Sequence, residues 1–133
     1  MIKIYIDGSS IGNPGKSGIG YVIYESSSNK TLKEESIYLG IQSNNFAEYM
    51  ALVFSLADAL AMNKKSVQVF SDSKLICEQI NGNFKVKNKN IYPLFVLATN
   101  LISKLDNFSI AHIDREKNKK ADKLAKEATG FLI

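Results

Sequence analysis

The spacing of apolar residues along the chain alternates between a strand pattern and a helix pattern. Short runs rich in β-branched and aromatic residues predict strands at residues 2–7, 19–25, 35–41, 67–70 and 108–113. Apolar residues three and four positions apart predict helices at about 45–62, 73–81 and 93–104, and a last helix beginning at Asp114 or Glu116. The first three strands follow one another, whereas the later strands alternate with helices. We therefore expect an α/β fold whose mixed five-stranded sheet, an antiparallel meander followed by parallel strands, has helices packed on it.

Two of these helices have an apolar stripe that should face the core. In the 93–104 helix, Pro93 fits the first turn, where its missing N–H costs no hydrogen bond. The stripe of this helix consists of Leu94, Leu97, Ala98, Leu101 and Leu105. The stripe of the last helix consists of Ala121, Leu124, Ala125 and Ala128.

Residues 8–18 are rich in glycine and serine and are predicted to form a loop. The segment includes Gly15-Lys16-Ser17, which is typical of a phosphate-binding P-loop. However, Ser10 stands where the first glycine of that motif belongs, and a strand pattern follows where the motif requires a helix. We therefore exclude a P-loop and expect the glycines to bring the backbone close to whatever the neighbouring acids bind.

Composition excludes several classes of protein. A length of 133 residues suits one domain spanning 1–133 with an ordinary apolar core. The single cysteine, Cys77, lies in an apolar stretch, which excludes a disulfide scaffold or a cysteine zinc site and predicts core packing. The N-terminus reaches Asp7 before a signal-peptide apolar region can form, and no apolar run is long enough for a membrane span. We expect a soluble, cytoplasmic monomer with no obligatory protein partner.

The net charge of +4 is modest, but its distribution is uneven. In the first basic cluster, within residues 84–90, every second residue is a lysine: Lys85, Lys87 and Lys89. The second cluster occupies the C-terminal segment and consists of Arg115, Lys117, Lys119, Lys120, Lys123 and Lys126. Either cluster is explained by a solvated surface or by contact with a polyanion.

Two acids occupy equivalent places at the ends of predicted strands. Asp7 follows Ile4-Tyr5-Ile6, and Asp72 comes soon after Val67-Gln68-Val69-Phe70. If the two strands are adjacent and parallel, the carboxylates lie side by side at the edge where open α/β sheets bind ligands. Carboxylates in that arrangement repel each other unless a cation lies between them. The alternative is that each acid caps a turn or a helix.

Two further acids lie at predicted helices. Glu48 comes three residues after Asn45, which fits a capping box as well as a functional site and leaves Ser43 and Asn44 unexplained. Asp122 lies beside the alanine stripe of the last helix, and as an acid among lysines it also fits an ordinary ion pair.

Five short blocks resemble, in order and in their strand or helix context, the successive motifs of type 1 ribonuclease H. The blocks are Asp7-Gly8-Ser9, Gly12-Asn13-Pro14-Gly15, Asn44-Asn45-Phe46-Ala47-Glu48, Ser71-Asp72-Ser73 and Asn118-Lys119-Lys120-Ala121-Asp122-Lys123-Leu124-Ala125. They span nearly the whole chain, and they place four acids at the four catalytic positions of that family.

The resemblance implies an endonuclease that hydrolyses the RNA strand of RNA/DNA hybrids with two Mg²⁺ ions, for which Mn²⁺ substitutes. Such ions activate a water and stabilise the leaving 3′-oxygen without a protein nucleophile, and they prefer oxygen ligands. By this resemblance Asp7 bridges both ions and Asp122 serves the ion that activates water. Glu48 and Asp72 serve the ion at the leaving group.

The resemblance also implies residues that contact the substrate through backbone phosphates or minor-groove edges, where 2′-hydroxyls distinguish RNA from DNA. These residues are Gly8, Asn13, Ser43, Asn44 and Asn45. Lys74 stands where the family often has glutamine. A lysine can bind a phosphate but cannot reproduce the paired donor and acceptor of an amide.

The chain departs from the better-known bacterial members in three places. Residues 82–92 are shorter than their basic protrusion and contain no tryptophan, and Met1 directly precedes the first strand, so no N-terminal hybrid-binding domain is expected. Counting back from the fourth acid places His112 at the position of a catalytic loop histidine. The segment instead resembles a compact form in which Arg115 takes the loop position and His112 belongs to a strand, and we favour Arg115.

Two alternatives to the hybrid nuclease remain. The chain could be a related nuclease of the same fold that acts on other duplexes, or a nucleic-acid-binding module without catalytic activity. The four acids favour an active enzyme, and substrate competition together with a cleavage assay would separate the alternatives.

Overall fold

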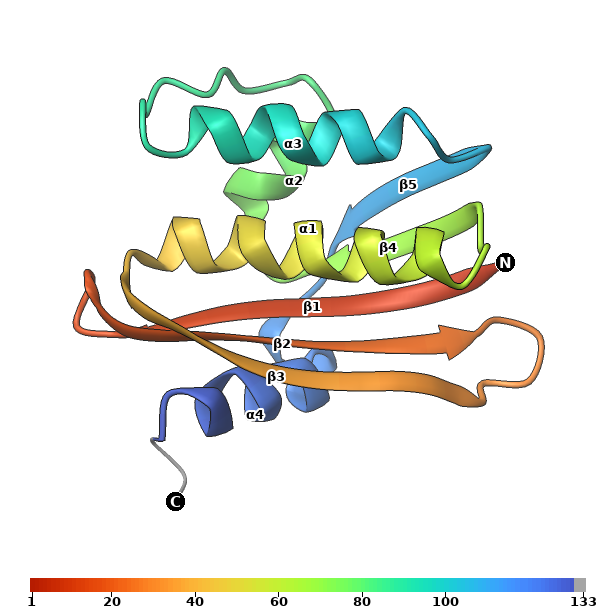
Figure 1. Ribbon diagram of the computed structural model, residues 1–133, viewed down its shortest axis with the longest axis horizontal. Coiled ribbons are helices and arrows are strands. Elements are labelled where there is room, and N and C mark those ends of the chain that lie inside the picture. The colour runs from red at the N-terminus through yellow and green to blue at the C-terminus, as the bar shows by residue number, and fades with distance from the viewer. Residues whose placement is uncertain (131–133) are drawn as a thin grey trace.

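A computed structural model describes residues 1–130 as one mixed sheet with helices on both faces (Figure 1). The strands are β1 (Ile2–Ile11), β2 (Gly15–Glu25), β3 (Thr31–Gln42), β4 (Ser66–Ser71) and β5 (Asn107–His112). The helices are α1 (Asn44–Ala61), α2 (Lys74–Ile80), α3 (Tyr92–Ile102), the short 3-10 helix η1 (Arg115–Lys117) and α4 (Lys119–Ala128). The α/β fold and its mixed five-stranded sheet are therefore confirmed.

The sheet has the strand order β3-β2-β1-β4-β5. The first three strands pair antiparallel, and β4 pairs parallel with both β1 and β5. Figure 1 shows α1 and α3 on one side of the sheet and α4 on the other. This topology places the carboxyl ends of β4 and of the parallel-paired part of β1 side by side.

The main core lies between the sheet and α1. Ile2, Ile4 and Ile6 of β1 are fully buried, because alternate residues of a strand point to one face. They meet the buried face of α1, which includes Leu52 and Leu56. Burial of such side chains contributes about 1.5–3 kcal/mol each relative to exposure, so this layer fixes α1 firmly on β1.

The predicted loop over residues 8–18 is wrong. Strand β1 runs on to Ile11 and β2 begins at Gly15, with Ser9 paired to Gly18 and Ile11 to Lys16. Small residues have low strand propensity, but backbone hydrogen bonds to a paired strand outweigh it here. The exclusion of a P-loop is confirmed, since a strand and not a helix follows.

Two glycines of these strands are needed because helices approach the sheet closely. A Cβ on Gly8 would lie 2.4 Å from the backbone N of Glu48 in α1, and one on Gly20 would lie 2.3 Å from the carbonyl oxygen of Ala121 in α4. Both distances are shorter than non-bonded contacts allow. Gly8 and Gly20 thus determine how near α1 and α4 come to the strands between them.

The apolar stripe predicted for α3 needs one correction. Leu94, Leu101 and Leu105 pack against the core and Ala98 is buried, whereas Leu97 is 45% exposed. Helix α3 packs mainly on α1 rather than on the sheet, so only a narrow stripe is covered and Leu97 lies at its edge. In α4, Ala121 and Ala125 are buried as predicted, and the helix begins at Lys119, after η1.

Candidate active site

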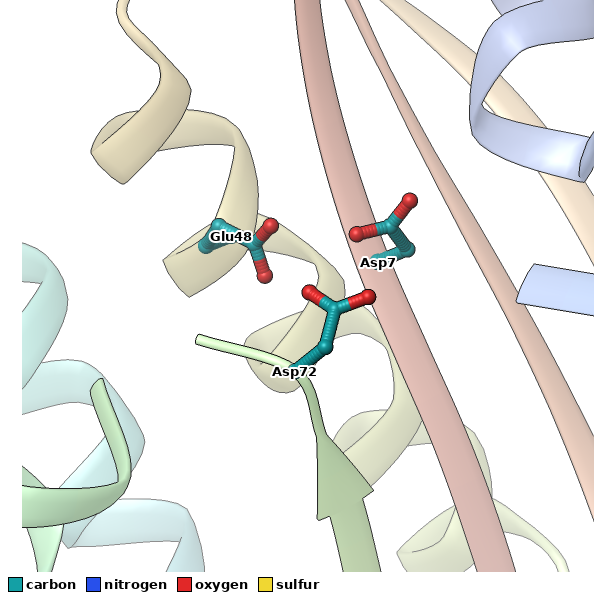
Figure 2. Close-up of side chains that lie close together, drawn as sticks. All are labelled: Asp7, Glu48 and Asp72. Carbon is teal, nitrogen blue, oxygen red and sulfur yellow. The ribbon is translucent and has the colours of Figure 1, made fainter. Parts of the chain in front are cut away.

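Three carboxylates from distant parts of the chain meet at the edge of the sheet. Asp7 of β1, Glu48 of α1 and Asp72, which directly follows β4, each offer an oxygen, and these oxygens lie within 4.8 Å of one another. Figure 2 shows the three side chains pointing toward one another. The parallel pairing of β1 with β4 ends at Ile6 and Ser71. Asp7 and Asp72 directly follow these two residues, so they lie side by side. The prediction that Asp7 ends its strand is wrong, since β1 runs on to Ile11; Asp7 is instead the first residue beyond the parallel pairing.

Glu48 reaches this position through the start of α1. The N-cap is Ser43, whose Oγ accepts a hydrogen bond from the Phe46 N–H at 3.1 Å. The alternative of a capping box formed by Asn45 and Glu48 is therefore excluded, because the cap lies two residues earlier and Asn45 is inside the helix. Glu48 is thus free of a capping role, and it is held against β1 by the close approach at Gly8.

Burial and mutual repulsion dominate the electrostatics of the three acids. Asp7 is 5% exposed and Glu48 7% exposed. Burial, followed by the negative charges of Glu48 and Asp72, raises the pKa of Asp7 well above its usual range. Burial, followed by the charge of Asp72, likewise raises the pKa of Glu48, and a backbone hydrogen bond from Gly8 opposes this effect. The cluster therefore cannot be fully ionised without a compensating positive charge.

The donor set fits a hard divalent cation. All three groups offer carboxylate oxygens, which Mg²⁺ and similar ions prefer. One oxygen of Glu48, Oε2, is buried without a hydrogen-bond partner in the described structure. A buried carboxylate oxygen without a partner is costly, and a bound cation would satisfy it.

Asp122 lies beside this cluster but is not one of its three members. It comes from the first turn of α4, and a hydrogen bond with it contributes to the raised pKa of Asp7. Its Oδ2 lies 3.0 Å from the Nζ of Lys126, one helical turn on. Both sequence interpretations of Asp122 therefore describe its surroundings: it forms an ion pair, and it lies next to Asp7.

The two candidates for the loop position both lie near the acids. His112 is the last residue of β5, as the compact form predicts, and its Nε2 is 3.2 Å from the backbone oxygen of Asp72. Arg115 is the exposed first residue of η1, and its positive charge lowers the pKa of Glu48. Arg115 thus acts on a carboxylate, whereas His112 contacts the backbone.

Comparison with known proteins identifies the family. A family model described as reverse transcriptase-like matches residues 5–128. The structure of RNase H1 from Halobacterium salinarum matches with a TM-score of 0.93 and 32% identity, covering 97% of each chain. The chain belongs to the type 1 ribonuclease H family.

Two further relatives of this ribonuclease H chain extend the comparison. LC11-RNase H1, isolated from compost by a metagenomic approach, was solved in complex with an RNA/DNA hybrid; it matches with a TM-score of 0.91 and 40% identity, covering 98% of this chain and 97% of that one. The bifunctional protein Rv2228c of Mycobacterium tuberculosis is 36% identical over 127 residues, which are 96% of this chain and 35% of that protein. The ribonuclease H chain thus spans about a third of the length of this mycobacterial relative.

The polar residues predicted to contact substrate gather at one end of the ribonuclease H sheet. The side-chain oxygen of Asn13 accepts a hydrogen bond from the Asn44 N–H at 3.0 Å, which ties the β1–β2 turn to the start of α1. Ser43 and Asn45 lie in the same short segment, and Gly8 lies against α1 at Glu48. Lys74 is exposed at the first position of α2, two residues after Asp72.

One residue of the site was missed by the sequence interpretation. Asn118 is 1% exposed, and its Nδ2 donates to the Ile6 carbonyl oxygen at 2.8 Å and to Asp72 Oδ2 at 3.3 Å. The predicted last helix began at Asp114 or Glu116 and so placed Asn118 inside it, whereas α4 begins at Lys119; no sequence pattern indicated the contact with Asp72.

The remaining reactive group of the ribonuclease H chain has a structural role. Cys77 is buried, as predicted, and burial raises the pKa of its thiol to about 11. It therefore stays protonated at neutral pH and is a poor nucleophile.

Within residues 1–130, no helix has the length and apolarity required to cross a membrane.

Proposed function

We propose that this protein is an endonuclease that hydrolyses the RNA strand of RNA/DNA hybrids, using two Mg²⁺ ions for which Mn²⁺ can substitute. The observation that carries the proposal is the meeting of Asp7, Glu48 and Asp72 within 4.8 Å, with Asp122 beside Asp7. The chemistry that bound ions supply to such a site is activation of a water and stabilisation of the leaving 3′-oxygen.

Each acid has a role in this proposal. Asp7, which interacts with the other three acids, would contribute to both ion sites, and Glu48 and Asp72 would hold the ion nearer the leaving group. Asp122 would hold the ion at the attacking water, and the Lys126 ammonium, 3.0 Å from the Asp122 carboxylate, would then have to share or release that carboxylate. The raised pKa values of Asp7 and Glu48 support this arrangement, because they reflect burial together with the negative charge of neighbouring acids, both of which a bound cation would offset.

We propose that the hybrid lies across the end of the sheet where the predicted contact residues gather. Asn13, Ser43, Asn44 and Asn45 then face the substrate beside Glu48, with Gly8 admitting close approach and Lys74 binding a phosphate. The complex of LC11-RNase H1 with an RNA/DNA hybrid supports this choice of substrate.

A groove continues from these residues toward the basic loop. Its volume is about 460 Å³, and its lining joins the start of α1 to the segment before α3. The lining includes Ser43, Phe46, Asn88, Asn90 and Ile91. Lys85, Lys87 and Lys89 are exposed in the same loop, so phosphates of the second strand would meet positive charge there.

We propose that residues 1–133 act as one catalytic domain and as a monomer.

Cleavage of an end-labelled RNA/DNA hybrid tests the proposal. DNA duplex, RNA duplex and single-stranded RNA of the same sequence serve as comparisons, each with Mg²⁺, Mn²⁺ or EDTA, and Asp72→Asn serves as the inactive control. We expect internal, metal-dependent cuts only in the RNA of the hybrid. Cutting of the RNA duplex would widen the substrate class, and binding of the hybrid without any cleavage would overturn the proposal.

Arg115 and His112 should differ in their importance for turnover. Arg115→Ala is expected to reduce kcat about 10- to 100-fold, because it removes a positive charge close enough to the acids to lower the pKa of Glu48. His112→Ala is expected to reduce kcat by less than about fivefold, because its contact is a single exposed hydrogen bond to backbone. Steady-state kinetics of both variants on the hybrid decide the ranking, and the reverse order would make His112 the catalytic loop residue.

A further inference from the structure

Asn118 joins the segments that carry three of the four acids. Its Nδ2 donates to the carbonyl oxygen of Ile6, the residue before Asp7, and to the carboxylate of Asp72. Its own carbonyl oxygen accepts the first hydrogen bond of α4, from the Asp122 N–H at 3.1 Å. One residue therefore contacts β1, the end of β4 and the start of α4.

The amide group of Asn118 donates hydrogen bonds to two different acceptors. One fixes the backbone immediately before Asp7, at 2.8 Å, and the other orients the side chain of Asp72, at 3.3 Å. Hydrogen bonds to a charged group are stronger than those between neutral groups. Because Asn118 is 1% exposed, water does not replace the amide readily. The Asn118 side chain thus links the backbone before Asp7 to the Asp72 carboxylate, in addition to the strand pairing that brings the two acids together.

Helix capping does not explain the orientation of Asn118. An asparagine at an N-cap normally accepts a hydrogen bond through its side-chain oxygen from an N–H in the first turn. In α4 no side chain caps the helix in this way, and the Oδ1 of Asn118 is buried without a partner. The amide is therefore turned away from the helix and toward the acids, at the cost of an unsatisfied acceptor.

We propose that Asn118 is a positioning residue for the nuclease reaction, whose amide sets the separation of Asp7 and Asp72 and thereby the cation site they form. The proposal rests on the proposed function. It assigns Asn118 no contact with substrate or reacting atoms. Its effect on turnover is transmitted through the two aspartates.

Three substitutions separate positioning from capping. Asn118→Asp keeps the size of the side chain and a good N-cap, but it sets an oxygen against the Ile6 carbonyl and the Asp72 carboxylate. Asn118→Ser keeps a good N-cap and removes the amide, and Asn118→Ala removes both. A capping role ranks aspartate and serine above alanine, whereas a positioning role ranks aspartate lowest and makes serine and alanine alike.

The control is Asn81, whose side chain also donates to a strand carbonyl: its Nδ2 is 3.3 Å from the Ile110 oxygen in β5, and Asn81 is exposed. No hydrogen bond joins its side chain to any of the four acids within residues 1–130. We expect Asn81→Asp and Asn81→Ser to leave kcat on the hybrid within about twofold of the parent, because they remove an asparagine-to-backbone contact away from the site.

Two measurements give the result. The first is kcat and KM on the hybrid: we expect kcat to fall at least about tenfold for Asn118→Ser and Asn118→Ala and about a hundredfold for Asn118→Asp, with KM within about threefold. The second is the rise in Tm that Mg²⁺ causes without substrate, which should need a higher Mg²⁺ concentration in Asn118→Ser and Asn118→Ala and not in the Asn81 variants.

The outcomes that contradict the proposal are distinct from failure of the proposed function. Rates that follow the capping order, or an Mg²⁺ response unchanged from the parent in Asn118→Ser and Asn118→Ala, would overturn it. If Asn118→Asp does not fold, the serine and alanine variants still decide between the two rank orders. If the parent protein does not cleave the hybrid, the proposed function fails, while the Mg²⁺ response still tests the role of Asn118.

Discussion

Replacing Asp7 with asparagine is expected to reduce hybrid cleavage by about a thousandfold or more while stabilising the metal-free protein. The loss of activity follows because Asp7 interacts with all three other acids and its charge is needed at both proposed ion sites. The gain in stability follows because a neutral amide of nearly equal size removes a buried group that repels Glu48 and Asp72. We expect the Tm in EDTA to rise by roughly 3–6 °C.

The control for this prediction is Asp106→Asn, which removes a charge from an exposed residue remote from the three acids. It should change neither kcat nor Tm appreciably, since surface substitutions usually have small effects. Cleavage by Asp7→Asn within tenfold of the parent rate would refute the assigned role. A lower Tm in EDTA would show that repulsion does not dominate at Asp7.

Removal of divalent cations is the second change with a large expected effect: EDTA should abolish cleavage and make the stability of the protein fall as pH rises. Burial and like charges raise the pKa of Asp7 and Glu48 in the folded protein. Above the ordinary carboxyl range, near pH 4, the folded protein therefore binds more protons than the unfolded chain. The stabilising contribution of these two protons is complete below that range and is lost as pH rises through the raised pKa values.

Thermal unfolding between pH 5 and pH 9 measures this effect, with EDTA or with Mg²⁺ in excess. In EDTA the Tm of the parent should fall with pH more steeply than that of Asp7→Asn, which has one fewer of these protons to lose. Mg²⁺ should make the Tm of the parent protein fall less steeply with pH, because a bound cation replaces the protons that the acids lose. Equal slopes for the parent in EDTA and in Mg²⁺ would mean that the acids do not share a cation.

The sequence was sufficient to predict the elements and the meeting of two acids, for a physical reason. Asp7 and Asp72 both follow apolar strand residues, and parallel strands bring such positions to one edge. Glu48 could be placed only at a helix start, because its distance from Asp7 depends on the missing side chain of Gly8. That contact joins residues forty positions apart, and no local pattern encodes it.

The errors also have local causes. Residues 8–18 contain many turn-forming residues, yet the pairing of β1 with β2 continues through them. Ser43 and Asn45 are both good N-caps, so the sequence alone does not choose between them, and the extended backbone of Ser43 decides it. Asn118 falls inside the last helix as the sequence predicted it, and only its burial and its contact with Asp72 reveal its use.

Helix α4 is docked through small residues, and this has a consequence for heat tolerance. Ala121 and Ala125 rest on the sheet where Gly18 and Gly20 leave room, whereas α1 is held by Tyr49, Leu52 and Leu56. Small side chains remove less apolar area from water, so releasing α4 requires less free energy than unfolding the sheet. Because α4 carries Asp122 and follows Asn118, its release alone would dismantle the site. We therefore expect cleavage activity to be lost on heating before the sheet itself unfolds.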